Sequence, residues 1–140
     1  MKRLLGLMDL KWAFPIIEME STAVHDMLKM CIQSPDVFIY MNASEDAMIL
    51  FLPLDRYKYN THIYTLESGR GRKLKSFIHE AGYKMFNETM CTVLMNFVEE
   101  DNRGLQLFMG AIGSTRVGTI PKSSEQGDTV LYCAYKEDWV

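Results

Sequence analysis

The chain has 140 residues, of which 48% are hydrophobic and 24% charged, a composition that excludes a disordered protein and suffices for one folded domain with a core. Its formal net charge of −3 argues against general coating of nucleic acid, so we do not expect a nucleic-acid partner. No stretch reaches the roughly 18 apolar residues of a membrane span, and we expect a cytoplasmic protein without a membrane partner.

The three cysteines, Cys31, Cys91 and Cys133, are widely spaced and odd in number. Each lies among apolar residues, which favours buried thiols in a reducing compartment over a disulfide framework. Their spacing fits no zinc motif, so we expect no metal site.

The first 36 residues predict an irregular segment and a helix. In residues 1–20, a leucine-rich run at 4–10 could start a short helix, and Pro15 confines any strand to a sheet edge or a strand start. A helix follows the cap candidates at 21–22 and ends at the Ser-Pro-Asp sequence at 34–36. Its apolar face, at helical spacing, consists of Val24, Met27, Leu28 and Cys31.

The next elements are strands. Two apolar runs, 37–41 and 47–52, flank a polar turn at 42–46, which predicts an antiparallel hairpin. A polar connection at 55–60 leads to a β-branched and aromatic run at 61–66, which predicts a further strand.

A helix follows this strand, and we expect it to end at Gly82 because its apolar periodicity stops there. The turn at 68–73 before the helix predicts an anion-binding site. The first N–H groups of a helix have no partner within it, the macrodipole is positive there, and glycine lets a phosphate approach the backbone. Four cations lie within a stretch of six residues that begins in this turn, namely Arg70, Arg72, Lys73 and Lys75. The alternative, a solvated charged helix start, stays open.

The remaining chain predicts three strands and a short helix. The most apolar strand should be central and buried. Asn102 or Asp101 caps the helix, which ends at Gly113, and Pro121 ends the strand after it, before a polar loop at 121–128. The expected strands are 89–98, 114–120 and 129–135. The resulting order of elements predicts a single mixed α/β domain over residues 1–140, with helices as crossovers.

This arrangement resembles the GNAT family of acetyl-CoA-dependent N-acyltransferases, roughly over residues 36–120. In that family a turn of the form Arg/Gln-x-x-Gly-x-Gly/Ala binds the pyrophosphate of coenzyme A, and Arg70-Gly71-Arg72-Lys73-Leu74-Lys75 occupies its place. A second signature is a strand, then an Asn, then a short helix that ends in Gly, and Met95-Asn96-Phe97-Val98 with Asn102 to Gly113 is similar to it. The resemblance implies a mostly antiparallel sheet of about six to seven strands, splayed between strands four and five and flanked by helices.

The resemblance also implies acetyl-CoA as the acyl donor, an amine as the substrate, and a set of site residues. Glu67 or Glu99 would act through water as the general base. The alternatives are a strand-end acid paired with Arg70 or Arg72 for Glu67, and a helix N-terminal acid for Glu99. The implied CoA-binding residues are Ser68, Gly69, Arg70, Gly71, Arg72 and Lys73 in the turn, with Val98 and Asn102 after the fifth strand.

The sequence departs from the family pattern. If Arg70 is the first position of the motif, Lys73 and Lys75 replace small residues, whereas a frame that starts at Ser68 puts Gly71 at the fourth position and Lys73 at the last. The lysine side chains would crowd the pyrophosphate unless they swing away, or their charge would be attracted to it. The usual general-acid tyrosine position is Met109, which cannot donate a proton. Tyr132 or Tyr135 of the last strand could supply the acid.

A second class of function therefore stays open. The run Ser68-Gly69-Arg70 and the helix ending in Ile-Gly are also similar to small GNAT-like internal virion and head-assembly proteins of tailed phages. That resemblance implies a catalytically inactive protein with a structural role in the virion and protein partners in an assembly. A contiguous apolar surface patch would favour this alternative, and binding of CoA would favour the enzyme.

Overall fold

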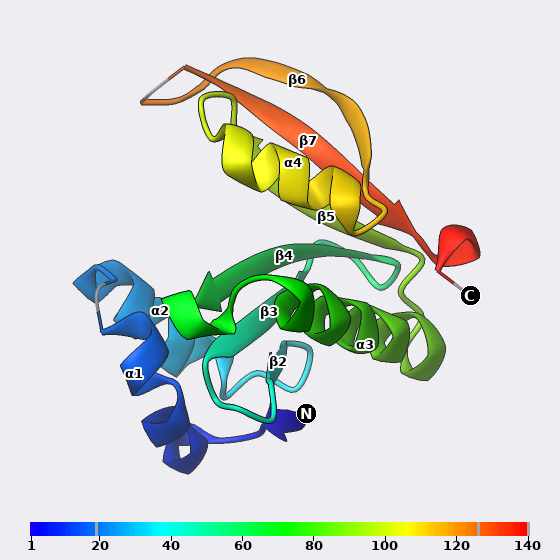
Figure 1. Cartoon of the computed structure of the whole chain (residues 1–140). Helices are drawn as coiled ribbons and strands as arrows, with labels where there is room; N and C mark the ends of the chain where they lie inside the picture. Colours follow the sequence, from blue (N-terminus) through cyan, green and yellow to red (C-terminus); the bar gives the residue numbers. More distant parts are fainter. Residues whose placement is uncertain (19, 126, 140) are drawn as a thin grey trace. The chain divides into compact units, whose positions relative to one another are not determined.

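The structure is a computed structural model that describes residues 1–18, 20–125 and 127–139 (Figure 1). Met19, in the expected irregular segment 1–20, and Gln126, in the expected loop 121–128, lie outside the described residues. The strands are β1 (Lys2–Leu4), β2 (Phe38–Met41), β3 (Ala47–Pro53), β4 (Lys58–Thr65), β5 (Val93–Glu99), β6 (Thr115–Ser124) and β7 (Gly127–Tyr135). The helices are α1 (Phe14–Ile17), α2 (Thr22–Cys31), α3 (Arg72–Glu88) and α4 (Arg103–Ala111), with 3₁₀ turns η1 (Leu7–Trp12), η2 (Glu67–Gly69) and η3 (Lys136–Asp138).

The seven strands form one sheet in the order β1-β2-β3-β4-β5-β7-β6. Neighbouring strands are antiparallel in the β1–β2, β2–β3, β5–β7 and β6–β7 pairs, whereas β4 and β5 are parallel. The register of the parallel pair covers Lys58–Asn60 and Val93–Met95, at the beginning of each strand, as expected for strands that splay further along. The fold is the expected mixed α/β sheet, mostly antiparallel and flanked by helices.

The chain divides into two compact units. The first unit contains Met1–Pro53 and Thr61–Ala81, and the second contains Leu54–Asn60 and Gly82–Val140. The expectation of a single domain over 1–140 stays a prediction. None of the helices in the described ranges is long and apolar enough to cross a membrane.

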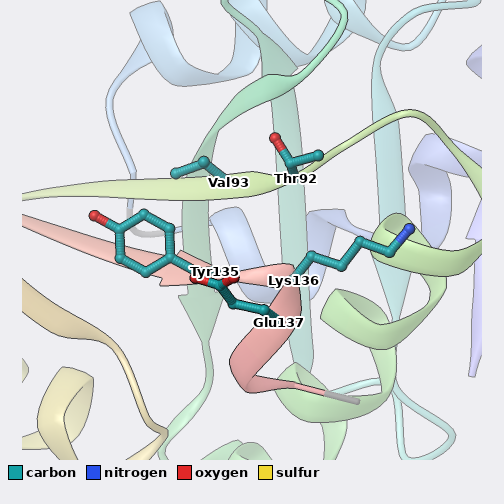
Figure 2. A pocket seen from close by; sticks show the side chains of 5 residues that line it. All are labelled: Thr92, Val93, Tyr135, Lys136 and Glu137. Atoms are coloured by element: carbon teal, nitrogen blue, oxygen red, sulfur yellow. The ribbon is translucent and has the colours of Figure 1, made fainter.

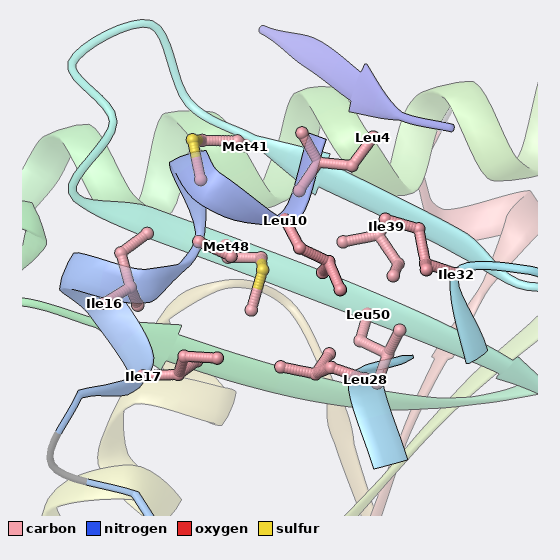
Figure 3. Packing of buried hydrophobic residues seen from close by; sticks show 11 residues of the cluster. Leu4, Leu10, Ile16, Ile17, Leu28, Ile32, Ile39, Met41, Met48 and Leu50 are labelled. Atoms are coloured by element: carbon pink, nitrogen blue, oxygen red, sulfur yellow. The ribbon is translucent and has the colours of Figure 1, made fainter. Parts of the chain in front are cut away.

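The core of the first unit lies between the N-terminal helices and β1–β3 (Figure 3). Ser21 caps α2 by accepting a hydrogen bond from the Val24 N–H, as expected, and Leu28 of this helix is fully buried against the core. Other buried members of the cluster are Leu4, Leu10, Ile16, Ile17, Ile32, Ile39, Met41, Met48 and Leu50. Burial of these side chains fixes the β2–β3 hairpin, which leads to the candidate site.

The N-terminal segment is more regular than expected. It contains β1, η1 and α1, and Pro15 is the second residue of α1 instead of limiting a strand. A missing N–H is tolerated there because the first turn of a helix has no intrahelical acceptor for it. The Asp9 carboxylate accepts hydrogen bonds from the N–H groups of Leu5 (2.8 Å) and Gly6 (3.2 Å), which holds the turn between β1 and η1.

The prediction that Gly82 ends its helix is wrong, because α3 continues to Glu88. A Cβ atom at Gly82 would lie 2.5 Å from the Trp139 ring, so this glycine makes room for the indole. Trp139 also packs edge-on against Phe86, with ring centroids 5.7 Å apart. Close packing, and not helix termination, therefore explains the glycine.

Three strand boundaries also differ from the prediction. β4 begins at Lys58, within the expected polar connection, and β5 begins at Val93 instead of residue 89. Along β5 buried and more exposed side chains alternate, and Phe97 is 43% exposed, so the strand is interior to the sheet but not buried on both faces. β6 passes through Pro121 to Ser124 because it is an edge strand with a register shift there, where a missing N–H costs little.

Most other predictions for the second unit are confirmed. The Asn102 side-chain oxygen caps α4 by accepting from the Leu105 N–H (3.1 Å), and Gly113 follows this helix with a φ of 89°. β7 spans Gly127–Tyr135, close to the predicted 129–135. Cys91 and Cys133 are buried as expected, whereas Cys31 is only half-buried.

Candidate anion-binding site

The turn between β4 and α3 leaves backbone donors open. Within the described residues, the N–H groups of Gly71, Arg72 and Lys73 donate no hydrogen bond, whereas those of Leu74 and Lys75 bond to the Gly71 carbonyl at 3.1 and 3.2 Å. These three consecutive donors stand at the positive end of a 17-residue helix. An anion is the ligand that such a group of donors accepts.

Gly71 has the backbone conformation and the space that a close ligand needs. Its φ of 87° lies in the left-handed region, which a residue with a Cβ adopts only at a cost. No atom lies within 4 Å of the position where a Cβ would stand, so the backbone is open on that side. The expected approach of a phosphate to this glycine is therefore sterically free.

Gly69 serves a different purpose from Gly71. A Cβ on Gly69 would lie 2.2 Å from the backbone carbonyl oxygen of Asp46, so the turn packs directly on the β2–β3 hairpin. The same carbonyl oxygen accepts a hydrogen bond from the Leu66 N–H at 2.9 Å. Gly69 is buried, so we assign it to the support of the turn within the first unit.

Asp46 is the buried charge beneath the turn, with 6% of its surface exposed. Its carboxylate accepts hydrogen bonds from Asn42 Nδ2 (2.7 Å) and Ser44 Oγ (2.8 Å) and forms an ion pair with Lys73 Nζ. Burial alone would raise the pKa of Asp46, but hydrogen bonds from Lys73 and from neighbouring polar side chains outweigh it and hold the pKa well below its ordinary value.

This ion pair settles the position of the Lys73 side chain. The ammonium group bonds to the hairpin, so the side chain swings away from the backbone N–H groups of the turn. The crowding expected from a lysine in place of a small residue is thus avoided. Its positive charge is already paired within the protein and is not the free charge that the sequence suggested.

The remaining cations of the turn are exposed. Arg70 Nε donates to Thr65 Oγ1 at 3.3 Å, which ties this side chain to the end of β4. In the described part of the chain, Arg70, Arg72 and Lys75 form no ion pair. Two guanidinium groups and one ammonium group therefore remain for an external anion.

Glu67 and Ser68 lie at the start of η2, next to this group of donors. The Glu67 side chain is exposed, without the partial burial that a general base would use, and among the described residues it pairs with neither Arg70 nor Arg72. Ser68 is exposed and contributes a hydrogen bond to Asp46. The structure thus brings the implied residues 67–73 together in one turn.

The second set of implied residues lies in the second unit, where β5 leads into α4. Val98 is buried, so its side chain belongs to the core, and Glu99 is exposed. The Glu99 carbonyl accepts from the Asn102 N–H (2.9 Å), and the Asn102 side-chain oxygen caps α4. Asn102 therefore has the structural role expected of a cap, whatever else it does.

The missing general acid is not replaced within α4. Met109 is 1% exposed and packs in the core of its unit. Of the two tyrosines on β7, Tyr132 is buried opposite Asn96 of β5, and Tyr135 is half-buried. The neighbouring Cys133 raises the pKa of Tyr135, which makes this phenol a weaker acid.

A pocket of about 520 Å³ lies beside Tyr135 in the second unit (Figure 2). It is lined by residues at the start of β5 and the end of β7, and Figure 2 shows the Tyr135 ring and the Lys136 side chain extending in opposite directions. Its lining residues are Thr92, Val93, Tyr135, Lys136 and Glu137. Of the tyrosines considered as acids, Tyr135 alone lines this pocket.

Sequence reasoning missed Asp46. The turn at 42–46 was predicted as a hairpin turn, but nothing local distinguishes an aspartate that stays exposed from one that becomes buried under a distant helix start. The one available signal was the set of polar residues Asn42, Ser44 and Asp46 at alternate positions, a pattern that can satisfy a buried carboxylate.

No protein-family model matches the sequence, and no curated protein is found as a relative. Solved structures do match. A chimera of the spermidine N-acetyltransferase SpeG from Vibrio cholerae and hSSAT is 10% identical, with 99% of each chain covered and a TM-score of 0.78. Spermidine/spermine N-acetyltransferase SpeG from Vibrio cholerae with manganese ions is 11% identical, with 96% of this chain and 91% of that chain covered and a TM-score of 0.72.

A proposed phosphinothricin N-acetyltransferase is 16% identical, with 96% of this chain and 97% of that chain covered and a TM-score of 0.69. At these identities the likeness establishes the fold and nothing further. The chain therefore has the GNAT fold that its sequence resembles.

Proposed function

We propose that the protein is a divergent GNAT-type N-acyltransferase that transfers an acetyl group from acetyl-CoA to an amine. One observation carries the proposal. The three open N–H groups at 71–73 stand at the start of a long helix, beside two arginines and an unobstructed glycine, in a fold shared with N-acetyltransferases. This combination suits the pyrophosphate of coenzyme A, because backbone donors and guanidinium groups both favour phosphate oxygens.

The residues of the turn fit the group they would hold. Backbone N–H groups of Gly71, Arg72 and Lys73 would bind phosphate oxygens, and the Arg70 and Arg72 side chains would neutralise their charge. Ser68 and Gly69 would shape the turn. Val98 and Asn102 of the second unit are left out of the proposed contact, because the Val98 side chain is buried and the Asn102 N–H and carbonyl already bond to Glu99 and Gln106. The Lys73 side chain, which pairs with Asp46, is left out of this contact.

Acetyl-CoA, when bound, would supply an activated acetyl thioester. The contribution of the chain is then mostly positioning of the reactants, which can account for a large share of catalysis. Backbone N–H groups of β5 would orient the carbonyl. Glu67 or Glu99 would accept a proton from the amine through water, although neither carboxylate has the partial burial that would make it a stronger base. Solvent or Tyr135 would give a proton to the CoA thiolate, which leaves as the amide bond forms.

Calorimetric titration with acetyl-CoA and with free CoA tests the proposal. We expect micromolar binding by the wild-type protein and its loss in Arg70→Glu/Arg72→Glu. The matched control is Lys29→Glu/Arg56→Glu, which makes the same change of net charge at two other exposed positions and should retain binding. An amine-acceptor screen follows. Absence of heat at millimolar ligand from folded protein would contradict the proposal.

A second candidate is a catalytically inactive GNAT-fold protein that assembles with protein partners, as in a phage virion. Two observations favour it. Met109 offers no proton, and the N-terminal segment exposes large apolar side chains within ten residues. These are Leu5 (68%), Leu7 (52%), Met8 (81%) and Phe14 (45%). Exposed apolar groups of this kind mark interaction surfaces when they gather together.

The two candidates differ in a measurable way. An assembly role predicts self-association or capture into a particle that Leu7→Lys/Met8→Lys weakens, with no effect on CoA binding. The enzyme predicts the opposite pattern, in which these substitutions leave turnover unchanged. Sedimentation velocity of the wild-type protein and of Leu7→Lys/Met8→Lys, together with the CoA titration of both proteins, separates the two candidate functions.

A further inference from the structure

The β2–β3 hairpin makes several contacts with the candidate anion-binding turn, and three of them, besides the hydrogen bond from Ser68, involve Asp46. Its backbone carbonyl accepts from the Leu66 N–H at 2.9 Å. The same carbonyl packs against the Gly69 Cα so closely that a Cβ there would stand at 2.2 Å. Its carboxylate forms an ion pair with Lys73 at the start of α3.

These contacts act on both ends of the turn. The backbone contacts fix residues 66–69, before the open N–H groups, and the ion pair fixes the side chain of Lys73, the last residue of the three. Gly71 lies between the two attachments, with no atom within 4 Å of its Cβ position. A short segment held on both sides loses little further conformational freedom when a ligand binds, so its affinity is higher than that of a loose turn.

The ion pair also sets the charge that the turn presents. Because the Lys73 ammonium lies against Asp46, it is kept from the open side of the backbone N–H groups. Asn42 and Ser44 hydrogen-bond the same carboxylate, so the buried charge is satisfied and its position is defined. The hairpin thus holds a lysine side chain out of the space that a phosphate would enter.

We propose that Asp46 is a positioning residue for the anion-binding turn: it holds residues 66–73 in the ligand-binding conformation and keeps the Lys73 side chain out of the site. The proposal rests on the proposed function for the identity of the ligand. The order of the turn does not depend on the identity of the ligand, and it can be measured in the free protein.

The simpler role is that Asp46 stabilises the fold without any specific effect on the turn. Two readouts separate these roles. The first is amide hydrogen exchange at residues 69–73, compared with exchange in the β2–β3 hairpin. The second is the affinity of the folded protein for CoA and its dependence on salt, because a lysine that contacts phosphate contributes to that dependence and a lysine paired within the protein does not.

The test uses Asp46→Asn, Lys73→Met and the double variant. Either single substitution should accelerate exchange at 69–73 and raise the Kd for CoA about tenfold, the equivalent of one charge-assisted hydrogen bond. The double variant should lose little more than either single one, since both break the same contact. Lys73→Met should leave the salt dependence of CoA binding as in the wild type.

The matched control is Glu45→Gln. This acid precedes Asp46 in the same turn, and it pairs with Lys2 at 3.0 Å instead of with α3. The Glu45→Gln substitution removes one negative charge, as Asp46→Asn does, and should change neither amide exchange at 69–73 nor the Kd for CoA. In Asp46→Asn and in Glu45→Gln the new side chain is close in size to the native one, so we expect both proteins to fold. Circular dichroism checks this.

Two outcomes overturn the proposal. One is an Asp46→Asn protein with a lower melting temperature but unchanged exchange at 69–73 and an unchanged Kd. The other is a Lys73→Met protein with a shallower salt dependence, which would place the ammonium group on the ligand. If the wild-type protein binds no CoA, the proposed function fails, and the exchange measurement still decides whether Asp46 orders the turn.

Discussion

The chain contains two junctions from a strand into a helix, and they are built in opposite ways. The junction from β5 to α4 is closed by its own residues, because Asn102 caps the helix and the acids Glu99, Glu100 and Asp101 precede it. The junction from β4 to α3 has three open N–H groups and is surrounded by cations. Acids at a helix start complement the macrodipole and cations oppose it.

The difference shows which helix start is complete without a ligand. At the start of α4 the N–H groups of Arg103, Leu105 and Gln106 have local partners, and acids precede the helix, so an anion is not needed there. The start of α3 is held instead by distant contacts with Asp46 and leaves donors and arginine charges unmatched. An unfavourable arrangement of charge in the free protein is what a site adapted to an external anion requires.

The largest effect is expected where the distant support is broken. Gly69→Ala places a Cβ 2.2 Å from the Asp46 carbonyl oxygen. Because the alanine Cβ is fixed to the Cα and the group it meets is a backbone carbonyl, neither can turn aside, and we expect a loss of about 3 kcal/mol of unfolding free energy, at the upper end for overpacking. Chemical denaturation measures it, with Gly6→Ala as the control because nothing lies near that position. A loss no greater than in the control would show that the turn does not depend on this contact.

The stability of the protein in acid should depend on the contacts of the Asp46 carboxylate. The pKa of Asp46 is lower in the folded protein than in the unfolded chain, so its stabilising contribution is complete above the unfolded value of about 3.9 and is lost as the pH falls below it. We therefore expect a steeper loss of stability below about pH 4 in the wild type than in Asp46→Asn. Parallel acid titrations of the two proteins would contradict this account.

A smaller effect is expected at the closed junction. Asn102→Ala removes the cap of α4 and should cost about 1 kcal/mol of unfolding free energy. Since the start of α3 is a separate feature, the Kd for CoA should change little. Asn102→Ser is the control, because a serine can also cap a helix. A large loss of CoA binding in Asn102→Ala would assign this residue to the ligand and not to the helix.

The smallest effect has the opposite sign. Arg72→Glu replaces a cation with an acid in the first turn of α3 and should stabilise the free protein by about 0.5 kcal/mol while abolishing CoA binding. Arg103→Glu, the equivalent change at α4, should affect stability alone. Thermal unfolding and calorimetry of both variants measure the two quantities. An Arg72→Glu protein that still binds CoA would show that the arrangement of charges has no role in binding.

Local pattern predicted one junction well and the other in part. Asn102 was identified as a cap because capping depends on residues three apart in the sequence. The glycine and cations of the other junction were identified for the same reason. The position of the Lys73 side chain and the purpose of Gly69 depend on residues 20 or more positions away, which no local pattern identifies. For the burial of Asp46, the alternating polar residues at 42–46 are the one local signal.

The same limit explains the errors in the fold. Gly82 looked like a helix end because glycine often is one, and only its contact with Trp139, far along the chain, shows why it lies within α3. Pro121 looked like a strand end because the sequence does not say that β6 is an edge strand. Hydrophobic periodicity located the hairpin and the strands, and tertiary contacts decided where several of them begin and end.

Amide chemical shifts in a titration of ¹⁵N-labelled protein with CoA test the central claim most directly. The account predicts that the N–H signals of Gly71, Arg72 and Lys73 shift with a common Kd, while those of residues 102–105 at the start of α4 stay in place. Inorganic pyrophosphate should shift the same three signals more weakly. No shift at 71–73 with saturating CoA, or equal shifts at both helix starts, would contradict the claim that the start of α3 is the anion site.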